Sequence, residues 1–434
     1  MGTETNSKSL RAGFAEVNIT PPIGTAKIGV LKHLVSESVH DPLFARVAIL
    51  ENPAERVAFV QLDTLSVRWS QVAEIRRRVT EDYGFPGANV LVAATHNHAG
   101  PAVSNTGAVA RDDAYVETMI AKVVAAFGEA LANRQKAEIG FGRCPEFRVS
   151  HNRRIVRRDG TVSTHGNFLD ENALFVEGPI DPELAVLGVR SRTGELLGTL
   201  VNFACHVGHH GSSTALSAGF PGVLDREMKA RGCPMTLFLN GACGNIAYGE
   251  PGTGAIKDEE DIGTILAADV NGILDGMAYT PLAALAARSQ TIKLPYRECT
   301  EDEIQGTAFG AQRSVPLAPV YEHCLPTLLQ RIRERGTQPA DVQVLEVGEC
   351  TFVAIPAEYF AESGLRLKEQ SWPRRALLVS CANGMVGYAP TREAFERGGY
   401  ETTFGPTSHL APEAGDLLAD TAIQLVRGRW DQSV

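Results

Sequence analysis

The sequence lacks the marks of several large protein classes. No apolar run in its 434 residues approaches the roughly 20 that a membrane-crossing helix needs, so we expect no membrane span. The eight cysteines are scattered without a CxxC pair, which favours reduced thiols and a cytoplasmic location. The chain has few basic residues for its size, with 41 Lys and Arg against 51 Asp and Glu and a net charge of −10. Such a chain repels phosphate backbones, and we expect no nucleic-acid partner.

The composition that is present is that of an ordinary globular protein. Hydrophobic residues make up 44% of the chain and charged residues 21%, which is enough for a sizeable core. The stretch MGTETNSKSL is polar and predicts a disordered tail over residues 1–10. Residues 11–430 show no repeat and no clear linker, so we expect one domain there. The sequence leaves a homo-oligomer open.

The order of apolar segments predicts the fold class. We expect buried strands over 56–65 and 89–95, an amphipathic helix over 70–84 between them, and a long helix over 112–133 after them. This alternation predicts an α/β protein with mixed β-sheets flanked by helices in a single catalytic domain. The segment 249–340 carries no readable motif, and we expect it to form a lid and surface.

Two of the predicted strands end in histidines. ATHNHAGP places His96 and His98 after a strand, and their side chains share a face if the strand continues through them. VNFACH ends in His206, with His209 and His210 close behind, so two strand exits hold five of the eleven histidines. Histidine is the commonest metal ligand, and zinc is its usual metal in a redox-neutral site. The alternative for each is a hydrogen-bonded structural histidine.

Two further strand exits offer oxygen donors. Glu358 follows the apolar run FVAIPA, and Tyr388 follows Gly387 after another strand. A lone glutamate is more often solvated than functional, so neither position alone is evidence for a metal site. Neither an HExxH nor an HxHxDH pattern occurs. The four strand ends together still offer a set of metal ligands, although their spacing does not show that they meet.

The motifs occur in an order typical of one known family. They are AEVNITPPIG, DPLFARVAIL, ATHNHAGP, HNRR, VNFACH with SAGFPG, LNGACGN, IPAEYF, NGMVGYAPT and GGYET, and they span roughly residues 11–425. On these residues the chain resembles the neutral/alkaline non-lysosomal ceramidases, in a short bacterial form without the C-terminal immunoglobulin-like domain. The resemblance implies the ceramidase catalytic fold and a zinc hydrolase that cleaves the amide bond of N-acylated sphingoid bases.

The resemblance also implies roles for individual residues. It places the zinc ion on His96, His206, Glu358 and Tyr388. His98, and Arg153 of HNRR, match a histidine beside the metal and an arginine of the active site. We therefore expect His98 to handle a proton, and Arg153 and Tyr388 to stabilise the oxyanion. The neighbouring Arg154 is expected on a solvated hairpin edge.

LNGACGN departs from the family pattern. In the ceramidases a serine of this segment contributes at the scissile carbonyl, and its position here is Gly241. We expect Asn240, Gly241, Asn245 and His210 to border the substrate, although the two asparagines can equally satisfy the turn. Cys243 as a replacement nucleophile is the weaker interpretation, because a thiol in such a turn is usually packing.

The sequence therefore predicts a zinc-dependent hydrolase that cleaves an amide (N-acyl) bond by metal-activated water. Its expected partner is a small-molecule N-acyl or ester substrate. One alternative is a zinc hydrolase of an ester, lactone or cyclic amide of a small non-lipid compound. A second is a catalytically silent binding protein of the same fold, although a protein that has lost catalysis usually loses a ligand as well.

Overall fold

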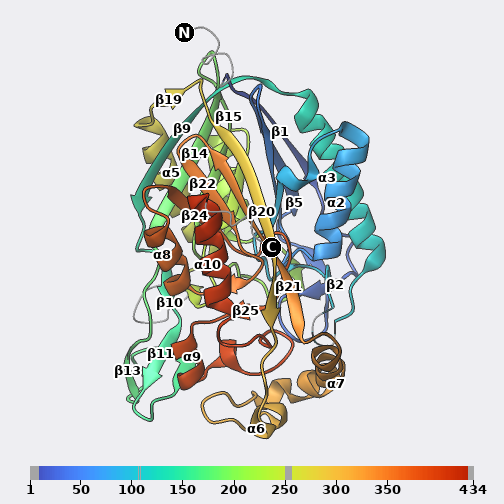
Figure 1. The fold of residues 1–434 in the computed structure, drawn as a ribbon, viewed down its shortest axis with the longest axis vertical. Helices are drawn as coiled ribbons and strands as arrows, with labels where there is room; N and C mark the ends of the chain where they lie inside the picture. The colour runs from blue at the N-terminus through green and yellow to red at the C-terminus, as the bar shows by residue number, and fades with distance from the viewer. Residues whose placement is uncertain (1–8, 106, 108, 250–256, 429–434) are drawn as a thin grey trace.

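The computed structural model describes residues 9–105, 107, 109–249 and 257–428. Nine strands form its largest sheet, in the order β17-β15-β14-β9-β1-β5-β6-β7 with β19 beside β9 (Figure 1). They are β1 Arg11–Asn18, β5 Phe44–Glu51, β6 Arg56–Leu62, β7 Val90–Ala94, β9 Gln135–Pro145, β14 Glu183–Ser191, β15 Leu196–Phe203, β17 Thr236–Asn240 and β19 Tyr279–Thr280. The pairs β6–β7 and β15–β17 are parallel, and the other pairs are antiparallel. The sheet is therefore mixed, as predicted.

A second sheet of four strands packs against the first. Its order is β20-β21-β22-β24, with β20 Leu285–Pro295, β21 Thr337–Val347, β22 Cys350–Ala354 and β24 Arg375–Val379. The rings of Phe59 and Phe352, one from each sheet, meet edge to face with their centroids 4.8 Å apart. A bridge between Ala93 and Ala382 also joins the two layers. The main apolar core lies between the sheets.

Helices cover the outer faces of both sheets (Figure 1). The nine-stranded sheet carries α2 Trp69–Tyr83, α3 Asp113–Ala132, α4 Phe220–Ala230 and α5 Glu259–Asp275, and the four-stranded sheet carries α8 Ala361–Gln370 and α10 Ala414–Arg427. In α2 the buried Val72, Ile75 and Val79 recur at helical spacing, and Gly84 ends the helix in the left-handed conformation. The predicted α/β class, with mixed sheets flanked by helices, is confirmed.

The predicted tail and the last residues of the predicted domain lie partly outside the described residues. The predicted tail falls mainly on residues 1–8, which lie outside the described residues, as do residues 429–430. Ser9 pairs with Leu282, and Leu10 is buried in the core between the sheets. Ser9 and Leu10 are therefore part of the fold and not of a disordered tail.

The segment 249–340 is more than a lid. Residues 250–256 lie outside the described residues, but the rest supplies α5, the edge strand β20, the helices α6 Glu301–Gln305 and α7 Ala318–Arg335, and the start of β21. In Figure 1, α6, α7 and α9 Arg392–Arg397 gather at the end of the molecule opposite β19. This end carries the site described below.

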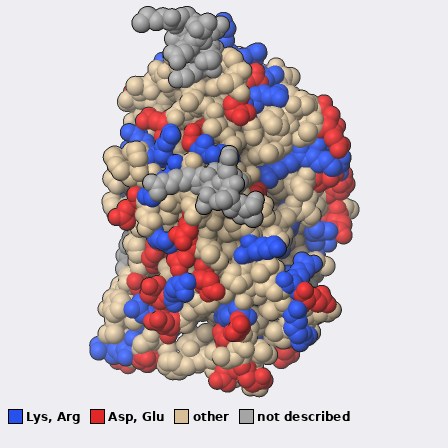
Figure 2. Space-filling view, viewed as in Figure 1, with Lys and Arg blue, Asp and Glu red and all other residues tan. Residues whose placement is uncertain are grey.

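None of the helices in the described parts of the chain is long and apolar enough to cross a membrane. All eight cysteines lie in described segments, and each is free. On the face shown in Figure 2, acidic and basic side chains are interleaved. The location in the cell stays a prediction.

Candidate metal centre

Two histidine-bearing loops meet beyond the C-terminal ends of β7 and β15, two strands that stand near opposite ends of the strand order. The loop after β7 and the loop after β15 form a parallel bridge at Asn97 and Val207, and the amide of His98 donates to the Val207 carbonyl at 3.0 Å. The buried Asn97 side chain donates to the carbonyl of Ser217 at 2.7 Å. Backbone pairing thus fixes the two loops against each other.

The backbone at His96 turns sharply. β7 ends at Ala94, and His96 has φ 68, a left-handed conformation that costs a non-glycine residue about 1 kcal/mol or more. The condition for a shared face of a strand, that the strand continues through His96 and His98, is therefore not met. The turn, and not strand alternation, brings the His96 and His98 rings together, with their Nε2 atoms 3.2 Å apart.

Three imidazole nitrogens converge at this point. His206 Nε2 lies 3.2 Å from His96 Nε2 and 3.0 Å from His98 Nε2. The other ring nitrogens face backbone carbonyls: His96 Nδ1 lies 2.9 Å from Leu65 O, His206 Nδ1 lies 3.2 Å from Cys243 O, and His98 bonds the backbone of Gly29. A carbonyl only accepts, so these nitrogens carry the ring protons and the Nε2 atoms present lone pairs. Such lone pairs repel one another unless a cation lies between them.

Glu358 and Tyr388 enter the site as neighbours on two short parallel strands. β23 Glu358–Tyr359 and β25 Tyr388–Ala389 pair in register, Glu358 opposite Tyr388. Glu358 Oε2 lies 3.2 Å from His96 Nε2, and the Tyr388 hydroxyl is hydrogen-bonded to the Glu358 carboxylate. Gly244 lies so close to the Glu358 carbonyl that a Cβ there would sit 2.6 Å from it, so glycine is needed in this turn. The four residues predicted to hold zinc therefore lie together.

The protonation of the cluster suits a cation. Burial and the charge on His96 lower the pKa of His98 to about 3, and burial lowers the pKa of His206 well below its ordinary value. Burial alone would lower the pKa of His96, but the Glu358 charge raises it to about 8. Burial would raise the pKa of Glu358, yet His96 and the hydrogen bonds hold it below its usual range. His98 and His206 are thus neutral and Glu358 is ionised, which are the states that a metal requires, and a bound metal ion would displace the proton that His96 shares with Glu358.

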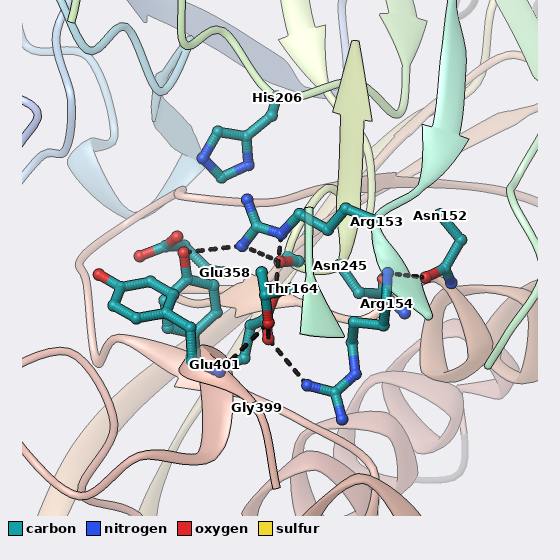
Figure 3. A network of polar contacts seen from close by, with 12 residues as sticks. Asn152, Arg153, Arg154, Thr164, His206, Asn245, Glu358, Gly399 and Glu401 are labelled. Atoms are coloured by element: carbon teal, nitrogen blue, oxygen red, sulfur yellow. Dashed lines mark hydrogen bonds and ion pairs between the residues drawn. The ribbon is translucent and has the colours of Figure 1, made fainter. Parts of the chain in front are cut away.

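Arg153 is the charged side chain beside this cluster. It is buried; its Nε donates to Glu401 at 2.8 Å, and its Nη2 donates to the Gly244 carbonyl at 2.8 Å and to the Tyr388 hydroxyl at 3.0 Å. In Figure 3 the third guanidinium nitrogen points toward His206. Arg153 therefore presents one donor toward the metal cluster while its other nitrogens are held.

Arg154 is not on a solvated edge, as the sequence predicts, but fully buried. Its Nη1 donates to Glu401 at 2.8 Å, so the Glu401 carboxylate bridges both arginines, and Thr164 donates to the same carboxylate at 2.9 Å (Figure 3). Burial would raise the pKa of Glu401, but the two guanidinium groups lower it to about 2. The sequence analysis does not single out Glu401, although Glu401 belongs to the GGYET motif on which the resemblance is based.

The asparagines of the LNGACGN segment form hydrogen bonds with backbone groups around the site. Asn240 is buried; its Nδ2 donates to the Thr95 carbonyl at 3.1 Å and its Oδ1 accepts from the Cys205 amide at 3.3 Å. Asn245 Nδ2 donates to Glu362 at 2.7 Å and its Oδ1 accepts from the Ala361 amide at 2.9 Å. Both asparagines thus hold backbone segments in place.

Gly241 and His210, like Asn240 and Asn245, are absent from the described residues that line the cavity at the site. A Cβ on Gly241 would meet Ala204 at 3.0 Å, so the turn is packed there. His210 pairs instead with Glu259 at 2.5 Å, and its ring lies 4.6 Å from that of His40. Gly241 is therefore a packing position and His210 forms an ion pair. The structure does not support the expected contact of either residue with the substrate.

The cluster opens into a cavity of about 920 Å³. His96, His98, Arg153, His206, Glu358 and Tyr388 lie in its wall. The opposite part of the lining comes from α7 and includes His323, Leu328 and Arg331. The metal cluster thus faces a space large enough for an organic substrate.

Comparison with known proteins finds a matching family model, a similar protein and similar solved structures. Residues 13–218 match the family described as "Neutral/alkaline non-lysosomal ceramidase, N-terminal". The neutral ceramidase of Pseudomonas aeruginosa is 22% identical, over 96% of this chain and 72% of that protein. The crystal structure of neutral ceramidase from P. aeruginosa has a TM-score of 0.73 at 19% identity, over 97% of this chain and 75% of that chain.

A second solved structure, described as a ceramidase complexed with C2, has a TM-score of 0.74 at 20% identity. It covers 98% of this chain and 76% of that chain. The predicted resemblance to the neutral/alkaline non-lysosomal ceramidases is confirmed: residues 13–218 match the N-terminal model of that family, and nearly the whole chain is similar in sequence and in fold to neutral ceramidase.

Proposed function

We propose that this protein is a zinc-dependent hydrolase that cleaves an N-acyl amide bond. Similarity to the neutral/alkaline ceramidases supports a hydrolase. The observation that carries the metal is the convergence of three imidazole Nε2 atoms within 3.2 Å of one another, beside the Glu358 carboxylate. Two nitrogens bound to one tetrahedral zinc ion lie about 3.3 Å apart, given zinc–nitrogen bonds of about 2.0–2.1 Å. The cluster therefore has the size of a zinc site.

His96, His206 and Glu358 form the centre of the proposed ligand set. His98 and Tyr388 both reach this centre, His98 through Nε2 and Tyr388 through its bond to Glu358. The Nε2 atoms of His98 and His206 lie 3.0 Å apart, a separation that suits two nitrogens on one zinc ion and favours a ligand over the proton-transfer role expected for His98. We therefore add His98 to the predicted ligands and keep Tyr388 at the edge of the set, between Glu358 and Arg153.

A zinc ion held there would supply the Lewis acid that polarises the substrate carbonyl and activates water. The residues of this chain supply the positions and the charges. Arg153 directs its free nitrogen toward the cluster, where it would bind the substrate carbonyl oxygen and stabilise the negative charge that develops on it. Tyr388 donates its hydroxyl proton to Glu358 and is fixed by Arg153, so it would orient that carboxylate. Hydrolysis then breaks the C–N bond, and water supplies a hydroxyl group to the acyl product and a proton to the amine.

The absence of a serine at position 241 is compatible with direct attack by metal-activated water. Gly241 stands at its position, tightly packed against Ala204, so attack by metal-activated water needs no serine hydroxyl in the turn. Cys243 is buried beside Cys381, and its carbonyl holds His206, which supports packing over a nucleophilic role. The same zinc site would also act on an ester or lactone, so the bond class needs a direct test.

The test is a hydrolysis panel on protein purified with its metal. It compares N-acyl amides of long and short acyl chains with the matched esters, before and after removal of the metal by a chelator. Amide cleavage that is lost with the metal and restored by zinc supports the proposal. Cleavage of the esters alone would favour the alternative bond class, and no cleavage in the metal-loaded protein would favour a silent binding protein.

A further inference from the structure

The described lining of the cavity carries more positive than negative charge. Among the described residues of the lining, the full charges are Lys32, Arg68, Arg153 and Arg331 against Glu358 alone. Arg153 is paired with Glu401, and Glu358 belongs to the metal cluster. The chain as a whole has a net charge of −10, and its surface in Figure 2 mixes both signs. The positive excess is therefore local to the cavity.

Arg331 reaches the cavity from one face of α7. Cys324, Thr327, Leu328 and Arg331 all line the cavity and stand at positions i, i+3, i+4 and i+7 of this helix. Arg331 Nε is buried and has no hydrogen-bond partner in the described structure. Arg331 thus brings to the cavity wall a guanidinium group whose hydrogen-bonding capacity the described residues leave partly unused.

Arg68 supplies a second guanidinium to the same wall. It precedes α2, is half-buried, and lies over the ring of Trp69 at 5.0 Å. Neither Arg68 nor Arg331 has an ion pair with any described residue. Arg68 and Arg331 line the same cavity, and burial, then the charges of Arg331 and Arg111, lower the pKa of Arg68 to about 10. Both also act on the buried His409, which lines the same cavity.

We propose that Arg68 and Arg331 form an anion subsite that binds a carboxylate or phosphate group of the substrate while the metal cluster holds its amide. Guanidinium groups match both anions through paired hydrogen bonds. Leu65, Leu317, Leu328 and Met385 line the same cavity and offer an apolar surface to the acyl chain. The substrate class is then an anionic N-acyl compound, such as an N-acyl amino acid. An uncharged lipid amide would leave both guanidinium groups unpaired. This inference rests on the proposed function.

The test uses substrates that differ only in charge. N-lauroylglycine is compared with N-lauroylglycinamide, and N-lauroylethanolamine phosphate with N-lauroylethanolamine, by kcat/KM at low and high salt. We expect the anionic member of at least one pair to be preferred by about tenfold or more, since a charge-assisted hydrogen bond contributes that much. Which pair shows the preference separates a carboxylate from a phosphate. Equal rates within both pairs would overturn the subsite.

Variants assign the preference to the arginines. Arg331→Ala and Arg68→Met should each reduce the ratio of anionic to neutral kcat/KM about tenfold, and Arg331→Lys should retain part of it. Arg333→Ala is the matched control, because it removes the same charge from an exposed position of the same helix. A preference that persists in the Arg68→Met/Arg331→Ala double variant would contradict the assignment.

Equilibrium binding separates this inference from the proposed function. N-lauroylglycine and N-lauroylglycinamide are titrated calorimetrically into metal-free and zinc-loaded protein. Tighter binding of the acid in both forms, lost with the arginines, supports the subsite even if no compound is hydrolysed, in which case the proposed function alone fails. A preference that appears only with zinc and survives the arginine variants would place the anion on the metal and overturn the subsite.

Discussion

His98 and His206 are 108 residues apart in the chain, and their Nε2 atoms lie 3.0 Å apart. The contact depends on the bridge between Asn97 and Val207, because the histidines stand one residue away from it on either loop. Each ring is held through its other side by a backbone carbonyl. The two nitrogens are thus aimed at each other by the backbone, at a separation that suits a shared metal ion.

The first prediction concerns His98. His98→Ala should weaken zinc binding by at least about tenfold, because it removes one of three converging nitrogens. His323→Ala, on the cavity wall but outside the cluster, should leave zinc affinity unchanged. Competition with a fluorescent chelator measures both. Unchanged affinity in His98→Ala would return this residue to a role beside the metal, with Tyr388 as the ligand.

Arg153 should matter for turnover and not for the metal. Arg153→Met removes the donor that faces the cluster but none of the four proposed ligands. We expect zinc content to stay the same and kcat to fall by about 100-fold or more, as for the loss of an oxyanion donor. Steady-state kinetics with elemental analysis checks both values. Loss of zinc in parallel with activity would show that Arg153 holds the ligands in place instead.

Glu401 should set part of the acid stability. Its pKa is about 2 in the folded protein and about 4.5 unfolded, so its contribution is present above pH 4.5 and is lost as the pH falls from there toward 2. A difference of 2.5 pKa units corresponds to about 3 kcal/mol in the free energy of unfolding. Urea unfolding of the wild type between pH 6 and pH 3 should show this loss.

The variant Glu401→Gln tests whether the ionised Glu401 carboxylate stabilises the folded protein. It should destabilise the protein at pH 7 by about 3–5 kcal/mol, because it leaves the buried Arg153 without an ionised partner and Arg154 with Glu177 alone. It should also lose less stability on acidification than the wild type. Glu396→Gln, at an exposed position of α9, is the control and should behave like the wild type. An identical pH profile for Glu401→Gln and wild type would refute this role.

A serine introduced at position 241, where the ceramidase pattern has one, should not increase the rate of amide hydrolysis. Gly241→Ser would place a Cβ 3.0 Å from Ala204, and overpacking of this kind costs about 1–3 kcal/mol. We expect a lower thermal midpoint and no gain in kcat. Gly272→Ser is the matched control, since a Cβ there meets nothing within 4 Å. A gain in amide hydrolysis at unchanged stability would show that the turn has room for a working serine.

The sequence predicts much of the fold because local patterns carry it. Apolar runs and end signals such as Gly84 place the strands and helices within a few residues of β6, α2, β7 and α3. The strand ends also predict that His96, His206, Glu358 and Tyr388 lie at chain turns. Their motifs, and not their spacing, predict that the four belong together.

Other features depend on contacts between distant segments. The left-handed turn at His96 breaks the alternation that a continuing strand would give, and no local signal marks it. Arg154 looks like part of a charged run, but its burial depends on Glu401, 247 residues later. Arg331 lies in a segment without motifs, and only the packing of α7 against the site shows that it lines the cavity.

Metal content tests the central claim most directly. The wild-type protein and the His96→Ala/His206→Ala variant are purified without added metal, and zinc per chain is measured by elemental analysis. We expect about one zinc ion per wild-type chain and almost none in the variant, at similar secondary-structure content. A wild-type protein that holds no metal and takes up none on titration, or a variant that keeps its zinc, would contradict a zinc site at the convergent histidines.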